Sequence, residues 1–179
     1  MEAGNPRLNK STILWKGLDV LAKDGPGSIT AARISRELNV TTGSFYWHFN
    51  TVEDFRQKLK EFFLEEIVLG ITNEAKARFE DPREILKAIG EMVKQRKTYR
   101  YDAAMRNWAK TSSEAEKIIV SADEFRREMM TELLRAAGEN DQDAKDHVNL
   151  LGIAWLGSQD MKDPDYRFKL LGLITKNSN

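Results

Sequence analysis

The chain has 179 residues, of which 41% are hydrophobic and 31% are charged, so it can bury the core of one large domain or two smaller ones and is not of the disordered type. It contains no cysteine, which excludes disulfides and thiolate metal sites, and no run approaches the ~20 apolar residues that span a membrane. The formal net charge is zero, yet residues 7–60 carry nine basic and five acidic side chains, which is either ordinary scatter or a basic head on a more acidic body.

The first predicted helix spans residues 8–23. It follows a segment without an apolar run, so we expect no signal peptide and a soluble, cytoplasmic protein. Leu14, Leu18 and Leu21 recur at helical spacing and give the helix a broad buried face. The sequence "DGPGS" that follows ends the helix with glycine and proline.

Two shorter helices are expected next. Thr30 is placed to cap a helix over residues 31–38, because its hydroxyl can accept a backbone N–H group of the first turn. Thr41 or Thr42 caps a third, very short helix that ends near His48. These segments show helical periodicity rather than the alternation that a strand requires.

The rest of the chain is also predicted to be helical. A fourth helix begins at Thr51, with acids in its first turn, and continues past Ile71. Further helices are expected at about 82–97, 101–110, 113–137, 142–158 and 164–176. The pattern therefore predicts an all-α protein, in which a domain of residues 1–50 joins a helical domain of residues 51–179 without a flexible linker.

The stretch "ITAARISRELNVTTGSFYWHF" matches a helix-turn-helix, the DNA-binding unit whose second helix enters the major groove. The side chains expected to close the core of this unit are Ile34, Leu38, Val40, Phe45 and Phe49. The residues left largely on the free surface of the second helix are Thr42, Gly43, Ser44, Tyr46 and Trp47. Small residues at the start of that helix let its backbone approach a groove about 12 Å wide. We therefore expect Tyr46, Trp47 and His48 to be offered to DNA.

The same residues resemble a known family. "ISRELNVTTGSFYWHFNTVEDF" looks like the N-terminal signature of the tetracycline-repressor (TetR) family of bacterial transcriptional regulators, and "FYWHF" is similar to the family's recognition-helix ending. The resemblance is strong over about residues 8–60 and weaker beyond. It implies an all-α homodimer with an N-terminal three-helix, helix-turn-helix DNA-binding domain and a helical C-terminal effector and dimerisation domain.

The resemblance also implies roles for individual residues. Tyr46 and His48 would contact phosphate, and Thr30 and Thr41 would place hydroxyls or helix N-termini against the DNA backbone. Phosphate contacts position a protein, whereas contacts to base edges specify sequence. The complete set predicted to bind DNA is Thr30, Arg33, Thr41, Thr42, Gly43, Ser44, Tyr46, Trp47 and His48.

Each of these residues has a structural alternative. Tyr46 could be a half-buried core residue with its hydroxyl as a polar handle, and His48 could cap the recognition helix. Trp47 could pack on a neighbouring helix, and Arg33 could be an ordinary solvated charge. The sequence also departs from the family at Val52, where a lysine is usual, so one phosphate contact is expected to be missing. A second, milder departure is an asparagine at position 39, where the turn usually has glycine.

Aromatic residues and methionines gather in the middle of the chain, as expected of either an effector pocket or an ordinary helical core. The candidates for a pocket that binds a small, neutral or mildly polar organic effector are Phe63, Tyr99, Tyr101, Met105, Arg106, Trp108, Phe125 and Met129.

The last two predicted helices are apolar, and small residues among them permit close approach. Paired across a two-fold axis they would form a four-helix bundle, and the alternative is that they complete the core of one protomer. The candidates for this dimer interface are Leu151, Gly152, Trp155, Leu170 and Ile174.

The chain lacks the residues that a catalytic or metal-binding function would need. The chain has two histidines and no cysteine, and it shows no P-loop, dinucleotide-binding or nucleophile-elbow motif, so we expect no enzyme, no metal and no cofactor. The sequence thus predicts a homodimeric regulator of transcription that binds a palindromic operator in double-stranded DNA, more specifically a repressor released by a small molecule. The alternatives are a regulator of the same fold without a small ligand, and a protein-interaction module that has lost DNA binding.

Overall fold

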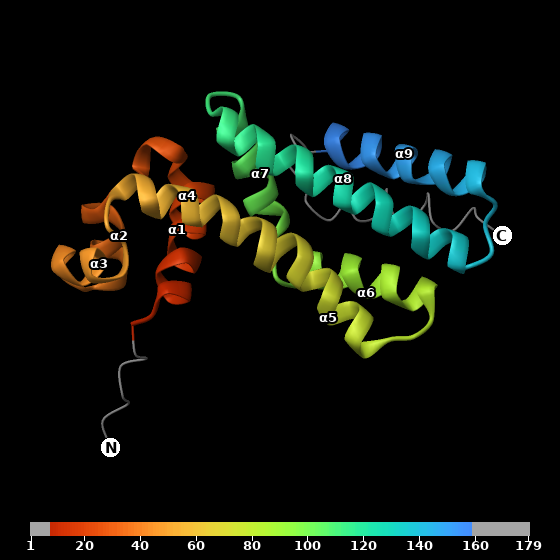
Figure 1. Cartoon of the computed structure of the whole chain (residues 1–179), viewed down its shortest axis with the longest axis horizontal. Helices are drawn as coiled ribbons and strands as arrows, with labels where there is room; N and C mark the ends of the chain where they lie inside the picture. Colours follow the sequence, from red (N-terminus) through yellow and green to blue (C-terminus); the bar gives the residue numbers. More distant parts are fainter. Residues whose placement is uncertain (1–7, 159–179) are drawn as a thin grey trace, which may run out of the picture. The chain divides into compact units, whose positions relative to one another are not determined.

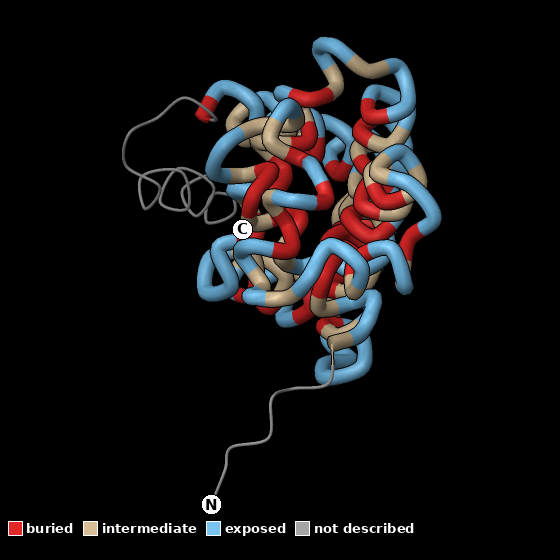
Figure 2. Tube along the Cα trace, turned by 90° about the vertical axis from the view of Figure 1, so that its left-hand side faces the viewer, coloured by how far each residue is buried: buried red, intermediate tan, exposed pale blue. Residues whose placement is uncertain are grey.

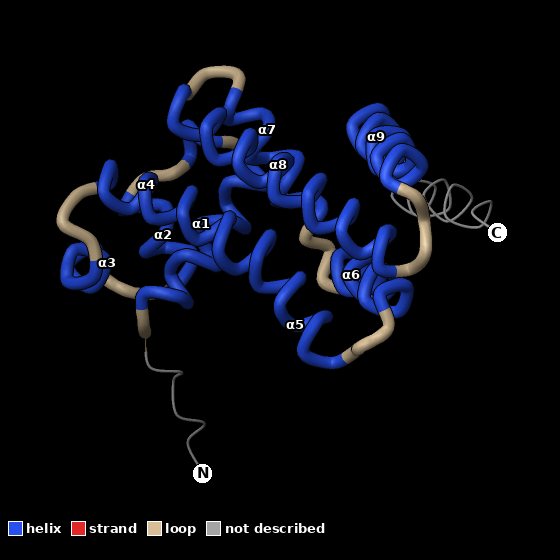
Figure 3. Tube along the Cα trace, turned by 45° about the vertical axis from the view of Figure 1, so that its right-hand side comes forward, coloured by secondary structure: helices blue, strands red, loops and turns tan. Residues whose placement is uncertain are grey.

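The computed structural model describes residues 8–158, and within this range all regular structure is helical (Figures 1 and 3). The elements are α1 (Lys10–Asp24), the 3₁₀ turn η1 (Pro26–Ser28), α2 (Ala31–Leu38), α3 (Thr42–His48), α4 (Val52–Phe62), the π-helical segment η2 (Phe63–Leu69), α5 (Gly70–Arg78), α6 (Pro82–Gln95), α7 (Tyr99–Ala109), α8 (Ser113–Ala136) and α9 (Asp141–Gly157). The predicted all-α fold is confirmed, and the predicted helix at 164–176 lies outside the described residues. No helix in the described range has the length and hydrophobicity needed to cross a membrane.

The chain divides into two compact units. Among the described residues, the first unit comprises residues 8–67 and 100–119, and the second comprises residues 68–99 and 120–158. The first unit therefore extends beyond residue 50 and includes most of α7 and the start of α8. The domain boundary predicted at residue 50 stays a prediction.

An aromatic cluster forms the centre of the first unit. The rings of Phe45, Phe49 and Phe55 are fully buried, with centroids 4.9 to 5.4 Å apart, a spacing at which tilted and edge-on aromatic pairs attract one another. Helix α1 lies close to α4 at Gly17, where an added Cβ would come within 2.6 Å of the Phe55 ring. Glycine is therefore required at this position by close packing.

The turn between α2 and α3 depends on Asn39. This residue has φ 55° and ψ 45°, the left-handed conformation that asparagine tolerates better than most residues. Its N–H group donates to the Arg36 carbonyl at 3.2 Å, and the Val40 N–H group donates to the Ser35 carbonyl at 3.0 Å. The departure from glycine at position 39 thus preserves the helix-ending turn.

The long helix predicted from Thr51 past Ile71 is interrupted by η2. The chain remains helical from α4 to α5, but seven residues of it adopt the wider π-helical geometry. The division between the two units falls inside η2, between Ile67 and Val68. Periodicity did not predict this change, because a π-helical stretch has no distinctive residue pattern.

The second unit pairs α5 with α6 and α8 with α9. Glu74 on α5 accepts two hydrogen bonds from the Arg96 guanidinium at 2.6 and 2.7 Å, which lowers the pKa of the Glu74 carboxyl. Between α8 and α9 an apolar cluster is buried; its members are Leu134, Ala144 and Val148, with Leu86 and Met130 packed against them. Figure 2 shows buried and exposed residues alternating along the helices, as amphipathic helices require.

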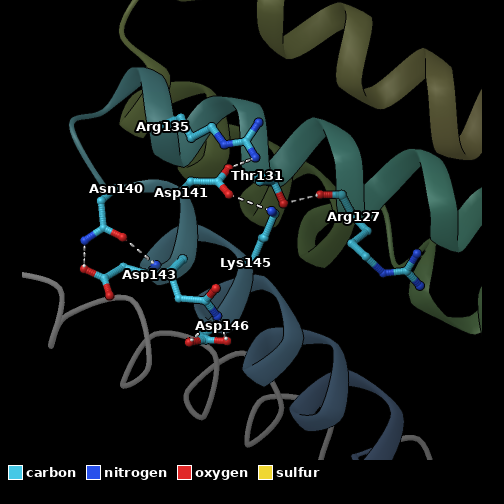
Figure 4. A network of polar contacts seen from close by, with 9 residues as sticks. Arg127, Thr131, Arg135, Asn140, Asp141, Asp143, Lys145 and Asp146 are labelled. Carbon is cyan, nitrogen blue, oxygen red and sulfur yellow. Dashed lines mark hydrogen bonds and ion pairs between the residues drawn. The ribbon is translucent and has the colours of Figure 1, made fainter.

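Polar contacts fix the start of α9 against the end of α8 (Figure 4). Asn140 caps α9, since its side-chain oxygen accepts the Asp143 N–H group at 2.9 Å. Asp141 accepts from Arg135 on α8 and, at 2.6 Å, from Lys145 one turn further along α9. The Asn140 cap and the ion pairs set where α9 begins.

Candidate nucleic-acid interface

Helix α3 has one buried face and one exposed face. Phe45 is fully buried, as is Phe49 directly after the helix, so α3 is anchored on the aromatic cluster of the first unit. Tyr46 is 51% exposed and Trp47 is 82% exposed. This separation follows from the turn of about 100° between successive residues of a helix.

The N-terminal end of α3 is open and lined with hydroxyl groups. The Thr41 Oγ1 atom accepts the Ser44 N–H group at 3.2 Å and lies 3.0 Å from the Ser44 hydroxyl. Thr42 and Gly43 are exposed. A Cβ added at Gly43 would have as its nearest neighbour the Thr41 Oγ1 atom, at an ordinary distance of 3.5 Å, so packing within the protein does not require glycine there.

The aromatic residues of α3 differ in how firmly they are held. The Tyr46 ring meets the buried Phe45 ring edge-on at 5.3 Å, so half of its surface is anchored and half is free. The Trp47 ring contacts the His48 ring edge-on at 4.7 Å. Among the described residues no neighbouring helix covers Trp47, as packing on such a helix would have required.

Arg33 is already engaged by two carboxylates. Its guanidinium lies 2.7 Å from Asp24 and 3.0 Å from Glu37. The backbone N–H group of Arg33 donates to the capping hydroxyl of Thr30 at 3.2 Å. A phosphate at Arg33 would have to compete with these ion pairs. The sequence alone does not show that the fold brings Asp24 next to Arg33. The predicted DNA-binding role of Arg33 stays a prediction.

The predicted effector residues are divided between the two units. The first unit holds Phe63, Tyr101, Met105, Arg106 and Trp108, and the second holds Tyr99, Phe125 and Met129. The polar groups among those of the first unit make internal contacts. The Tyr101 hydroxyl donates to Asp19 at 2.8 Å, with its pKa raised mainly by burial, and Arg106 pairs with the buried Asp102 at 2.8 Å. Of the eight residues, only Trp108 lines the cleft described below.

The predicted dimer residues on α9 are half-buried, and the helix exposes others instead. Leu151, Gly152 and Trp155 are intermediate in burial, while Leu170 and Ile174 lie outside the described residues. Three aliphatic residues of α9 that were not predicted are exposed, and these are Leu150 (51%), Ile153 (69%) and Leu156 (51%). Their spacing of three residues places them on one side of the helix within about 120°, a signal that the sequence did contain.

These features define the first unit as a helix-turn-helix module with an exposed second helix. The sequence pattern of the family described as bacterial regulatory proteins, tetR family, matches residues 13–58. The match covers α1 except for its first three residues, all of α2 and α3, and more than half of α4. Over these residues the chain is similar to the N-terminal domain of the TetR family of bacterial regulatory proteins.

Solved structures extend the likeness over almost the whole chain. A TetR transcriptional regulator from Legionella pneumophila is 14% identical with a TM-score of 0.73, covering 96% of this chain and 98% of its own. A transcriptional regulator from Rhodococcus sp. Rha1 is 19% identical with a TM-score of 0.69, covering 94% and 95%. A putative transcriptional regulator from Saccharomonospora viridis, solved in complex with choline, is 15% identical with a TM-score of 0.70, covering 94% and 96%. Identities this low establish the fold alone, and a search of curated proteins found no match.

Proposed function

We propose that the protein is a homodimeric transcriptional regulator, in which α3 reads the major groove of an operator and a small molecule controls binding. The observation that carries the proposal is α3 itself. Its buried edge rests on Phe45, and its outer face presents Tyr46, Trp47 and an unobstructed Gly43. Such a helix costs little to insert into a groove, because its core anchor does not have to move.

The proposed contacts follow from side-chain chemistry. Tyr46 and His48 contact phosphates, as do the capping ends of α2 and α3 at Thr30 and Thr41, where backbone N–H groups gather. The residues proposed to face base edges or thymine methyl groups are Thr42, Gly43, Ser44 and Trp47. One short helix reads few base pairs, so two copies on a palindrome are needed for specificity.

Dimerisation is proposed to use α9. Leu150, Ile153 and Leu156 form a continuous aliphatic face on this helix, and an isologous interface requires a surface that complements itself. A symmetric pair of such helices buries both faces at once. This face adds exposed residues to the predicted set of Leu151, Gly152 and Trp155.

Control by a small molecule is proposed from the fold and its relatives. One regulator with this fold was solved in complex with choline, which supports a ligand site in proteins of this shape. A ligand that prefers one conformation shifts the equilibrium by its difference in affinity for the two states, typically about 1–3 kcal/mol. Release of the operator on ligand binding would make the protein a repressor.

The test of DNA recognition is to recover genomic fragments bound by the purified full-length protein and to measure affinity for the enriched site by fluorescence anisotropy. Tyr46→Ala is expected to weaken that affinity about tenfold, because it removes a charge-assisted phosphate contact. Phe79→Ala, a change at an exposed aromatic of the second unit, is the matched control. If no site is enriched at low salt, or if the Tyr46 variant binds as tightly as the parent, the proposed role of α3 in DNA recognition is wrong.

A further inference from the structure

A cleft of about 640 Å³ opens in the first unit. Its walls come from three separate segments, namely Pro26 and Gly27 of η1, one face of α4 from Glu53 to Lys60, and the stretch from Trp108 to Glu114 where α7 passes into α8. All three segments belong to the same compact unit. The volume lies in the range of small-molecule sites, about 300–1,000 Å³, and exceeds what a single inorganic ion fills.

Lys60 is the unusual residue of this cleft. Only 5% of its surface is exposed, although lysine is almost never buried without a partner. Its ammonium lies 5.2 Å from the centroid of the buried Trp108 ring. Within residues 8–158 the Lys60 ammonium makes no hydrogen bond and has no carboxylate within 4.0 Å.

The neighbouring charged groups have partners of their own, except that the Arg56 Nε atom is buried without one. Arg56 pairs with Glu53 at 3.2 Å and donates to the Ile29 carbonyl at 3.0 Å. The Glu114 carboxylate accepts from the Ser112 hydroxyl at 3.1 Å at the start of α8. Its pKa is lowered chiefly by its own backbone N–H group, then by the Ser112 and Ser113 hydroxyls, and only to a smaller extent by the charge of Lys60. The Lys60 ammonium is thus left to face the cleft.

Most of Lys60 is buried, but its ammonium has no hydrogen-bond partner and is not fully enclosed. The Trp108 ring stabilises this cation in part, because the face of an indole attracts an ammonium. An anion or hydrogen-bond acceptor in the cleft would stabilise it further. An oxyanion there would form a charge-assisted hydrogen bond in partly desolvated surroundings, where such bonds are strong.

We propose that this cleft binds a small organic monocarboxylate, with its carboxylate on Lys60 and its apolar part against Trp108 and Pro26. The single charge follows from the carboxylates of Glu53 and Glu114 in the same cleft, which disfavour a second negative group. The inference rests on the proposed function only in that it names the class of effector. Binding itself can be measured in the absence of DNA.

The cleft is also connected to the helix-turn-helix. Arg56 lines the cleft and holds the Ile29 carbonyl, and Ile29 immediately precedes Thr30, the residue that caps α2. A ligand that moves Arg56 would therefore disturb the start of α2. This contact gives a bound carboxylate a short path to the DNA-binding surface.

The experiment is a calorimetric titration of the full-length protein with benzoate, phenylacetate and indole-3-acetate, each to about 10 mM, and with the corresponding amides. At least one carboxylate is expected to bind saturably, with its amide about tenfold weaker or more, because the amide lacks the charge that Lys60 recognises. Saturable binding of none of the three carboxylates would overturn the proposal. So would equal affinity for acid and amide, or tighter binding of inorganic phosphate.

The matched variants are Lys60→Met and Lys58→Met. Both remove one ammonium from α4, but Lys58 is half-exposed and pairs with Asp54 at 3.6 Å. Lys60→Met is expected to lose carboxylate binding, to keep its melting temperature within about 5 °C of the parent, and to leave a methionine that can still contact Trp108. Lys58→Met is expected to bind as the parent does. Unchanged binding by Lys60→Met overturns the site, and the acid-to-amide comparison on the parent decides the question if that variant does not fold.

A final measurement separates this inference from the proposed function. Operator affinity is determined with and without the bound carboxylate, and a change of about 5- to 150-fold is expected. Unchanged affinity would overturn the coupling through Arg56, while failure of the protein to enrich any operator would overturn the proposed function instead.

Discussion

Helices α3 and α9 both expose large apolar side chains, but the chemistry of the two surfaces is different. On α3 the exposed residues are Tyr46 and Trp47, and they stand beside the hydroxyl groups of Thr42 and Ser44. On α9 they are purely aliphatic, spaced three residues apart, and the helix is more than twice as long. The chemical type of an exposed apolar surface, and not only its area, therefore indicates which partner it binds.

The difference indicates two different partners. Tyrosine and tryptophan combine an apolar body with a polar group, which suits a surface of phosphates, bases and ordered water. An aliphatic face stabilises a complex only when other apolar atoms cover it and remove it from water, and a second copy of the same helix can supply those atoms. Changes confined to one of these helices should therefore affect one partner and spare the other.

The largest effect is expected from Phe45→Ala. Removing a fully buried phenylalanine from the cluster with Phe49 and Phe55 should lower the free energy of unfolding by about 3–5 kcal/mol. Urea denaturation followed by circular dichroism measures this change. Trp47→Ala is the control, because a residue that is 82% exposed should alter DNA affinity without altering stability. Equal stability of the two variants would mean that α3 is not anchored as described.

A charge on the aliphatic face of α9 should break the proposed dimer. Ile153→Glu places one carboxylate on each copy at the most exposed position of that face, and the dissociation constant is expected to rise about 100-fold. Sedimentation velocity over a range of concentrations measures it. The folded protomer should persist, since Ile153 is not part of the buried cluster between α8 and α9.

Val120→Glu provides the matched control for this variant. Val120 is a 48% exposed aliphatic residue of α8 in the same unit, so it receives the same charge outside the aliphatic face of α9. If both variants dissociate equally, the effect is one of net charge. If neither does, α9 is not the dimer interface.

Gly43→Ala should separate the protein's own packing from its approach to DNA. The added methyl group meets only the Thr41 Oγ1 atom, at an ordinary contact distance of 3.5 Å, and alanine in a helix is about 0.5–1 kcal/mol more stable than glycine. Affinity for the operator is expected to fall about tenfold, because the methyl group holds the α3 backbone away from the groove. Gly90→Ala on α6 meets no atom within 4 Å and should leave affinity unchanged. Unchanged affinity in both variants would place α3 further from the bases than proposed.

Local patterns in the sequence predicted most of the helices. Caps and breaks placed α6 to α9 within about two residues of their observed ends. Thr30 was predicted as a cap and Thr41 as one of two alternatives with Thr42, and the hydroxyls of Thr30 and Thr41 accept backbone N–H groups at 3.2 Å. These features depend on residues three or four positions apart, so the sequence displays them directly.

Features that depend on tertiary contacts were not predictable in this way. The pairing of Arg33 with Asp24 joins residues nine positions apart, and the contact between Lys60 and Trp108 joins two helices that are distant in the chain. The π-helical form of η2 has no residue signature. The pattern of α9 was visible, but an apolar helix can be buried on either side, and only the structure indicates that Leu150, Ile153 and Leu156 are the exposed residues.

The smallest effect, and the only expected gain, concerns Val52, the first residue of α4, where the resemblance implies a lysine. Val52→Lys restores one cation on each protomer, and we expect operator affinity to rise a few-fold at low salt. For the two cations of a dimer, the slope of log affinity against log salt is expected to be steeper by about 1.8. A lysine at a helix N-terminus opposes the helix dipole, so stability should fall by about 0.3–1 kcal/mol. Val120→Lys, the same change at a half-exposed valine of α8 in the second unit, should leave the slope unchanged. Equal slopes for parent and Val52→Lys would mean that the start of α4 does not meet a phosphate, and DNA contact would then be confined to α2 and α3.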